Sequence, residues 1–93
     1  MQILWDSEKN NKLIAQRGLS FDIFASLILE KKYLDILKNP SREEQKIFIV
    51  PFQKYTYVVP FLIDDEQNII LKTIFPSRKY HKIYGEKNES NTE

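Results

Sequence analysis

Three apolar segments in the second half of the chain most constrain how it can fold. They read KIFIVPF, YTYVVPFLI and NIILKTIF, and only Gln53-Lys54 and DDEQ separate them. β-branched and aromatic residues favour strands, and such short separations are typical of hairpin turns. The pattern therefore predicts successive antiparallel strands, in a sheet of three to four strands.

These segments are apolar on both faces, which indicates that both sides of the sheet are covered. Two preceding helices can cover one side, and another element or a partner protein must cover the other. Pro51 and Pro60 fall within the segments, and proline has no N–H to donate to a ladder. We therefore expect both prolines at edges or bulges of an irregular sheet.

Two helices are predicted before the strands. The first spans about residues 7–17, with Asp6 or Ser7 as its N-cap and Gly18 as the left-handed residue that ends it. The second follows directly, with Ser20 as its N-cap and phenylalanine, leucine and isoleucine at helical spacing. Each helix can therefore place an apolar side on the sheet.

The remaining segments complete an α+β fold. After the second helix ends near Lys31, YLDILKNPSREEQ shows no sustained period, and Asn39, Pro40 and Ser41 form a turn cluster ahead of a charged loop. Ser77, which follows Pro76, can cap a last short helix, RKYHKIY, and the polar residues 86–93 are predicted to be a disordered tail. We expect a single domain over residues 1–85: two N-terminal helices packed on an antiparallel sheet, with a short C-terminal helix.

Composition excludes several classes of protein. The formal net charge of the 93 residues is +1, so binding of polyanions through the overall field is excluded and any such site must be local. The absence of cysteine excludes a disulfide scaffold, a thiolate metal site and a cysteine nucleophile. The opening MQILWDSEKNNK lacks the pattern of a signal peptide, and no apolar run approaches the length of a membrane span. We expect a cytoplasmic protein that does not associate with membranes.

Cationic side chains gather near the C-terminus. The segment KTIFPSRKYHKIY, residues 72–84, contains no acidic residue. Its basic residues are Lys72, Arg78, Lys79, His81 and Lys82. The end of the last strand and the free amides of a helix beginning at Ser77 would bring these charges together, which predicts a phosphate-sized anion site. The alternative is an amphipathic surface helix whose cations are solvated.

Motifs at both ends of the chain resemble the BrnT-type toxins of bacterial type II toxin–antitoxin pairs. The opening WDSEKNNKLIAQRGLSFD is similar to theirs at Trp5, Asp6, Lys9, Asn10, Arg17, Gly18, Ser20 and Phe21. The family segment KTIxPSRK is matched by Lys72, Thr73, Ile74, Pro76, Ser77, Arg78 and Lys79. The resemblance extends to Gly85, but the better-known members carry Lys-His-Gly where this chain has Gln16-Arg17-Gly18.

The resemblance implies a RelE-like fold and an endoribonuclease that inhibits growth until a cognate antitoxin binds. The antitoxin expected for this class is a ribbon-helix-helix DNA-binding protein, so contact with DNA is expected only through it. No cofactor or metal is expected, and the contiguous acids Asp64, Asp65 and Glu66 are interpreted as turn residues. The alternative is an inactive homologue that acts as a binding or co-repressor module, which Gln16 favours slightly.

Within this interpretation, four cations are the candidate catalytic residues. Metal-free RNA cleavage needs a base for the 2′-hydroxyl, an acid for the leaving 5′-oxygen and cations for the charge that builds on phosphorus. Arg78 is the candidate for phosphate stabilisation, because its planar guanidinium matches phosphate oxygens. Lys72 can do the same, or can act as the base if cationic neighbours disfavour its protonated form. Lys79 and Arg17 complete the set through their places in the two motifs.

Further residues are candidates for binding RNA. Tyr57 and Tyr80 can stack bases, although core packing is the alternative for Tyr57 because it shares a strand face with apolar residues. The polar candidates are Lys9, Ser77 and Lys82. His81 is the only histidine and a candidate acid or base, because histidine titrates near neutral pH, and a solvated surface side chain is the alternative.

Overall fold

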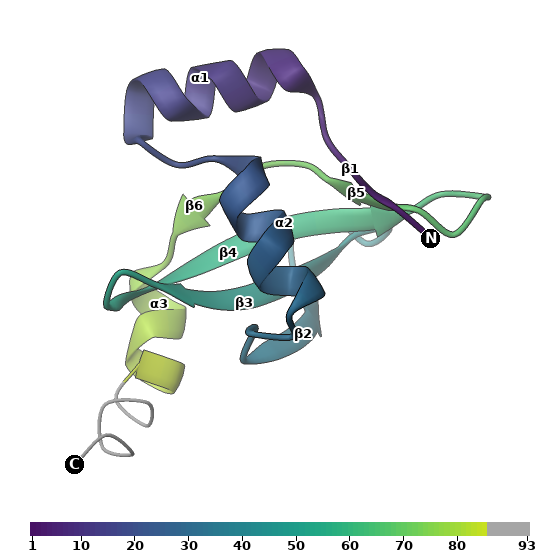
Figure 1. Ribbon diagram of the computed structural model, residues 1–93. Coiled ribbons are helices and arrows are strands. Elements are labelled where there is room, and N and C mark those ends of the chain that lie inside the picture. The colour runs from purple at the N-terminus through teal and green to yellow at the C-terminus, as the bar shows by residue number, and fades with distance from the viewer. Residues whose placement is uncertain (86–93) are drawn as a thin grey trace.

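A long β-hairpin forms the centre of the computed structural model, which describes residues 1–85 (Figure 1). β3 (Lys46–Phe52) pairs antiparallel with β4 (Tyr55–Ile63). Gln53 and Lys54 make the turn, with φ angles of 49° and 65°. Positive φ at both central residues is typical of a type I′ turn, whose twist matches that of the strands. The predicted hairpin is confirmed.

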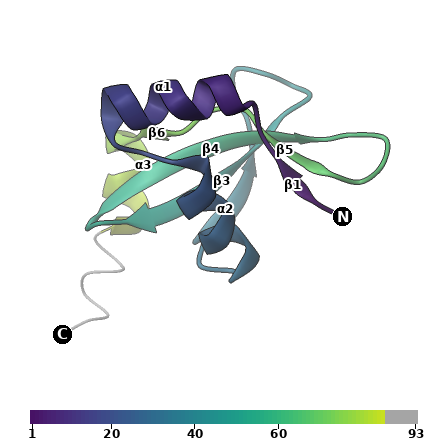
Figure 2. The same cartoon turned by 45° about the horizontal axis from the view of Figure 1, so that its top comes forward.

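Short elements extend this hairpin into a sheet of six strands, in the order β1-β5-β4-β3-β2 with β6 also paired to β4. β1 and β5 are parallel, and the other pairs are antiparallel. Figure 2 shows β1 beside β5 near the N-terminus. The other elements are β1 (Ile3–Leu4), α1 (Ser7–Arg17), α2 (Phe21–Leu29), β2 (Asp35–Lys38), β5 (Ile69–Leu71), β6 (Phe75–Pro76), α3 (Arg78–Tyr80) and the π-helical turn η1 (His81–Gly85).

The α+β class and the order of elements are confirmed, but the prediction of three to four strands was wrong. β2 lies in a segment to which no strand was assigned, because a strand of four residues is too short to establish a period. The third predicted strand is divided, since β5 ends at Leu71 and β6 begins at Phe75. Lys72 was predicted to lie in the last strand. It lies instead in the connection between β5 and β6.

Both prolines pair within the β3–β4 hairpin, and each lies where no further strand pairs on the side away from its hairpin partner. Pro51 is opposite Thr56 in the hairpin, beyond the point where β2 stops pairing at Ile49. The carbonyl of Pro60 accepts a hydrogen bond from the N–H of Lys72, at 2.8 Å. This contact lies where β5 has ended and β6 has not begun, so the missing N–H of proline falls in the gap between them.

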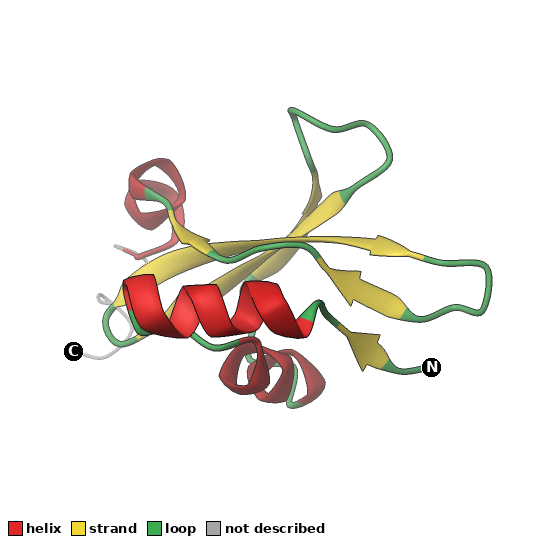
Figure 3. Ribbon diagram, turned by 90° about the horizontal axis from the view of Figure 1, so that it is seen from above, coloured by secondary structure: helices red, strands yellow, loops and turns green. Residues whose placement is uncertain are grey.

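α1 and α2 cover one face of the sheet, and the C-terminal helix lies on the other (Figure 3). Phe21 and Phe24 of α2 are completely buried against the central strands. On the opposite face, Tyr80 and Tyr84 pack on a small apolar cluster of Ile47, Ile49 and Val58. The predicted second cover of the sheet is therefore supplied in part by the chain itself.

The predicted caps of the helices are confirmed. The carboxylate of Asp6 accepts a hydrogen bond from the N–H of Glu8, at 2.8 Å, and Gly18 ends α1 with a φ of 65°. The hydroxyls of Ser20 and Ser77 cap α2 and α3. The predicted disordered tail lies outside the described residues. Within residues 1–85, no helix is long and apolar enough to cross a bilayer.

Candidate functional site

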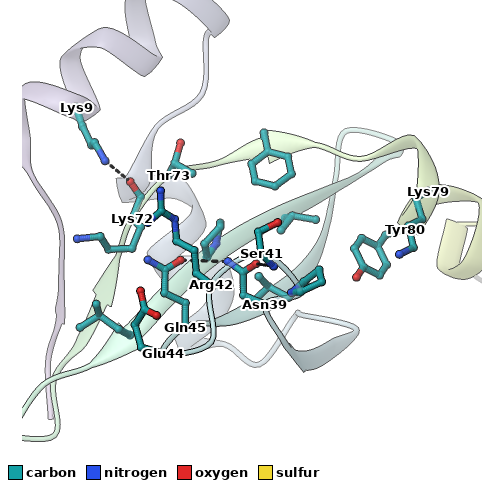
Figure 4. A pocket seen from close by; sticks show the side chains of 16 residues that line it. Lys9, Asn39, Ser41, Arg42, Glu44, Gln45, Lys72, Thr73, Lys79 and Tyr80 are labelled. Carbon is teal, nitrogen blue, oxygen red and sulfur yellow. Dashed lines mark hydrogen bonds between the residues drawn. The ribbon is translucent and has the colours of Figure 1, made fainter.

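A hollow of about 750 Å³ lies on the sheet face opposite α1 and α2 (Figure 4). Its floor is apolar and is formed by Ile47, Val58 and Pro60. Four segments wall it: α1, the loop between β2 and β3, the connection from β5 to β6, and α3. We call this site the basic hollow, because cations line its walls.

Four cations from four different segments line the basic hollow: Lys9 of α1, Arg42 of the β2–β3 loop, Lys72 after β5, and Lys79 of α3. The only acidic residue in the lining is Glu44. Among residues 1–85, the one ion pair joins Lys32 to Glu30, so none of these four cations is paired with a described carboxylate. The site therefore presents uncompensated positive charge around an apolar floor.

Hydrogen bonds hold two of the walls in place. The ammonium of Lys9 donates to the carbonyl of Lys72, at 3.0 Å, and so ties α1 to the β5–β6 connection (Figure 4). Across the β2–β3 loop, the amide of Asn39 donates to the side-chain oxygen of Gln45, at 3.1 Å. The N–H of Gln45 in turn donates to the carbonyl of Arg42, at 3.0 Å. These contacts fix the backbone that carries the cations.

The predicted site residues are divided between the two faces of the sheet. Lys72, Lys79, Tyr80 and Lys9 line the basic hollow. Arg17 lies on the helical face, where its guanidinium donates to the carbonyl of Ile74 at 3.2 Å. With Tyr57, Phe75 and Pro76, Arg17 lines a second depression, which shares only Phe75 with the lining of the hollow. Tyr57 also packs on the main core, through an edge contact with Phe24 at 5.5 Å between ring centres.

Two predicted cations, Arg78 and Lys82, are exposed residues that the structure does not bring into the lining of the hollow. Ser77 lies under α3: its hydroxyl accepts a hydrogen bond from the N–H of Tyr80, at 3.2 Å. Its own N–H donates to the carbonyl of Thr56, at 3.0 Å. The position of Ser77 therefore explains how Lys79 and Tyr80 reach the hollow.

His81 is held by contacts away from the hollow. Its Nδ1 lies 3.0 Å from the hydroxyl of Thr56, a residue only 1% exposed. Its ring stacks on Tyr55 with 4.3 Å between ring centres. A Cβ at Gly85 would come within 2.5 Å of the imidazole, so a larger residue there would displace the ring. These contacts give His81 a structural role in attaching η1 to the sheet.

The acidic residues between β4 and β5 form a turn. The carboxylate of Asp64 accepts hydrogen bonds from the N–H groups of Asn68 and Glu66, each at 2.9 Å. The backbone hydrogen bond from Asn68 is the main cause that lowers the pKa of Asp64 below its ordinary value. In residues 1–85, no group of three or more histidine, cysteine or acidic residues is placed to hold a metal ion.

Sequence reasoning missed Arg42, Glu44 and Phe75, which line the basic hollow. Arg42 and Glu44 belong to a charged loop that carries no motif, and Phe75 was assigned to an apolar strand. No spacing along the chain relates the loop at residues 39–45 to the segment at 72–75. Only the pairing of β2 with β3, and of β4 with β5 and β6, brings them to one face.

Comparison with known proteins identifies the fold. No protein-family model matches the sequence, and no curated protein was found to be similar in sequence. Among solved structures, the fold is that of a small ribonuclease toxin. The match is to the 1.1 Å crystal structure of BrnT from Brucella abortus, with a TM-score of 0.61 and 20% sequence identity. It covers 83% of this chain and 96% of that chain, so the two proteins share one fold.

Proposed function

We propose that this chain is the toxin of a type II toxin–antitoxin pair and an endoribonuclease that needs no metal. The observation that carries the proposal is the convergence of Lys9, Arg42, Lys72 and Lys79 on one hollow, in a fold shared with a ribonuclease toxin. RNA backbones carry one negative charge per nucleotide, and unpaired cations at a concave site bind such a backbone.

The chemistry proposed at the basic hollow is transfer of the phosphodiester to the neighbouring 2′-oxygen. A base takes the 2′-hydroxyl proton, the 2′-oxygen bonds to phosphorus, and the 5′-oxygen leaves with a proton. The products are a 2′,3′-cyclic phosphate and a 5′-hydroxyl. Lys72 and Lys79 stabilise the charge on the phosphorane, which is usually the largest catalytic contribution.

The carboxylate of Glu44 is a side chain of the lining that can accept the 2′-hydroxyl proton. We assign the phosphate contact to Lys72 and Lys79 and the base to Glu44. Lys72 is the alternative base, but as a neutral amine it would no longer stabilise the phosphorane. Arg78 is exposed and directly precedes Lys79 in α3, which supports a contact with the phosphate of a flanking nucleotide as its role. Arg17 acts by holding the carbonyl of Ile74, and hence the β5–β6 connection, in position.

A partner would regulate this activity. We propose that a cognate ribbon-helix-helix antitoxin binds the chain in the cytoplasm and that the complex contacts DNA only through the antitoxin. Binding that covers the basic hollow would exclude RNA and so restore growth. The alternative function is that of an inactive homologue which retains only the antitoxin contact.

The experiment that tests the proposal is controlled induction of the chain in a bacterial host, followed by analysis of total RNA. We expect growth arrest with RNA fragmentation for the unaltered protein, and loss of both effects for Lys72→Ala and Lys79→Ala. Arg78→Ala should weaken both effects. Lys32→Ala is the matched control, because this exposed lysine makes only a surface ion pair with Glu30.

Two results would contradict the proposal in different ways. Arrest and fragmentation that survive Lys72→Ala would place the active site elsewhere on the fold. Normal growth with a folded and abundant product would favour the inactive homologue, with the basic hollow as a binding surface alone.

A further inference from the structure

Phe75 is an aromatic residue exposed at the basic hollow. Its side chain is 37% exposed, although β6 pairs it directly with the buried Val58. Directly opposite residues of an antiparallel pair point to the same face of the sheet, and Val58 forms part of the floor of the hollow. Phe75 therefore presents its ring at the same site as the unpaired cations.

The ring of Phe75 has no aromatic partner, whereas the other aromatic residue of the lining is occupied. Among residues 1–85, Phe75 takes part in none of the ring pairs. Tyr80 packs on the apolar cluster, and the ammonium of Lys79 lies over its ring at 5.2 Å from the centre. Phe75, and not Tyr80, is thus available to a ligand with a flat apolar face.

The backbone that carries Phe75 is fixed on both sides. The guanidinium of Arg17 holds the carbonyl of the preceding residue, Ile74, at 3.2 Å. Two residues after Phe75, the N–H of Ser77 donates a hydrogen bond to the carbonyl of Thr56, at 3.0 Å. A preorganised platform loses little conformational entropy when a ligand stacks on it.

Lys72 and Lys79 line the hollow on either side of Phe75 in the sequence, three residues before it and four after it. Cations that track a phosphate backbone, together with an exposed aromatic face, are the features of single-strand binding sites. In an A-form duplex the base faces are stacked on one another, so this combination is of use only for unpaired nucleotides.

We propose that Phe75 is the stacking platform for one unpaired nucleobase and that the basic hollow therefore takes single-stranded RNA and rejects duplex. The choice of RNA as ligand rests on the proposed function. Stacking on a ring tolerates any base, because every base has a π face. Phe75 accordingly selects for unpaired structure and not for sequence.

The test compares binding of three labelled nucleic acids by fluorescence anisotropy. The first is a short single strand of 2′-O-methyl RNA, in which the nucleophilic hydroxyl is blocked so that binding is measured without cleavage. The second has the same length and phosphate charge but lacks all bases, and the third is the matching duplex. We expect the unaltered chain to bind the single strand roughly tenfold more tightly than either of the others.

Substitutions of Phe75 then isolate the ring. Phe75→Leu keeps the apolar volume and should remove this preference, while affinity for the abasic strand and the slope of affinity against salt stay unchanged. Lys72→Ala should instead weaken the binding of all three ligands. It should also lower the slope of log affinity against log salt concentration by about 0.7. The matched control is Ile63→Ala, another exposed apolar residue of the sheet, 50% exposed and outside the lining.

A second variant reports the contact directly. In a Trp5→Phe background, Phe75→Trp should retain the preference, and its fluorescence should be quenched by the base-bearing strand but not by the abasic one. Trp5 stacks on Phe21 with 6.0 Å between ring centres, and phenylalanine at position 5 keeps an aromatic ring for this contact. This measurement stands even if Phe75→Leu lowers stability.

Equal affinity of the unaltered chain for the base-bearing and abasic strands would overturn the inference, as would unchanged selectivity in Phe75→Leu. Either result would leave the cations of the hollow as its contact with RNA, without a stacked base. RNA fragmentation in cells without base-dependent binding would overturn the platform while the proposed ribonuclease stands. Base-dependent binding without any cleavage would overturn the ribonuclease while the platform stands.

Discussion

At the residue scale, Asn10 is the polar side chain that joins the two helices. It is only 9% exposed, and its carbonyl oxygen accepts a hydrogen bond from the N–H of Phe21 at 2.8 Å. Its amide donates to the carboxylate of Asp22, at 2.9 Å. One side chain thus satisfies a free N–H at the start of α2 and sets the position of that helix against α1.

We predict that Asn10→Ala lowers the free energy of unfolding by about 2 kcal/mol, because the buried N–H of Phe21 would lose its partner. Asn11→Ala is the matched control, since Asn11 is the next residue of α1 and is exposed. Urea denaturation of the two variants measures the difference. A cost for Asn10→Ala no greater than that for Asn11→Ala would contradict this account of how the helices are joined.

The sequence predicted residues whose role is local but not those whose role depends on a distant partner. Asp6, Ser20 and Ser77 were identified as caps because their partners lie within three residues. Asn10 was noticed only as part of a motif, since its partner Phe21 lies in the next helix. His81 was proposed as an acid or base on its chemistry alone, and its contact with Thr56 spans 25 residues.

At the element scale, η1 is attached to the sheet by a hydrogen bond between its tyrosine and the first residue of β2. The hydroxyl of Tyr84 donates to the carboxylate of Asp35, at 2.8 Å. This hydrogen bond, with a contribution from burial, raises the pKa of Tyr84 above its ordinary value. α3, which directly precedes η1, carries Lys79 and Tyr80 into the basic hollow, so the attachment of η1 shapes the site.

We predict that Tyr84→Phe lowers the free energy of unfolding by about 1 kcal/mol near neutral pH, a value limited by solvent screening at this half-exposed site. The folded-state pKa is raised, so the stabilisation is complete below about pH 10, the ordinary pKa of tyrosine, and is lost as pH rises through the raised pKa. Denaturation across that range measures it.

Tyr80→Phe is the matched control for this prediction, since the hydroxyl of Tyr80 makes no hydrogen bond to residues 1–85. Tyr80→Phe should leave the free energy of unfolding unchanged at neutral pH. Comparison with it across the pH range removes the contribution of other titrating groups from the effect of Tyr84→Phe. A destabilisation of Tyr84→Phe that is absent near neutral pH, or that persists unchanged in strong alkali, would show that the bond to Asp35 does not hold η1.

At the scale of the whole molecule, the two faces of the sheet differ in what covers them. α1, α2 and the main hydrophobic core lie on one side of the sheet, and the basic hollow lies on the other, together with the C-terminal helix. Strand composition and helix caps made the class and order of elements predictable. The hollow was only half predicted, because Lys72 and Lys79 share a motif whereas Arg42 and Glu44 reach them through strand pairing over some thirty residues.

The central claim is that the basic hollow cleaves RNA without a metal ion, and the end groups of RNA treated with the purified chain in excess chelator test it most directly. We predict fragments that end in 2′,3′-cyclic phosphate and 5′-hydroxyl, at a rate that Lys72→Ala lowers at least a hundredfold and Lys32→Ala leaves unchanged. No cleavage by the unaltered chain, fragments with 3′-hydroxyl ends, or a fully active Lys72→Ala variant would contradict the account.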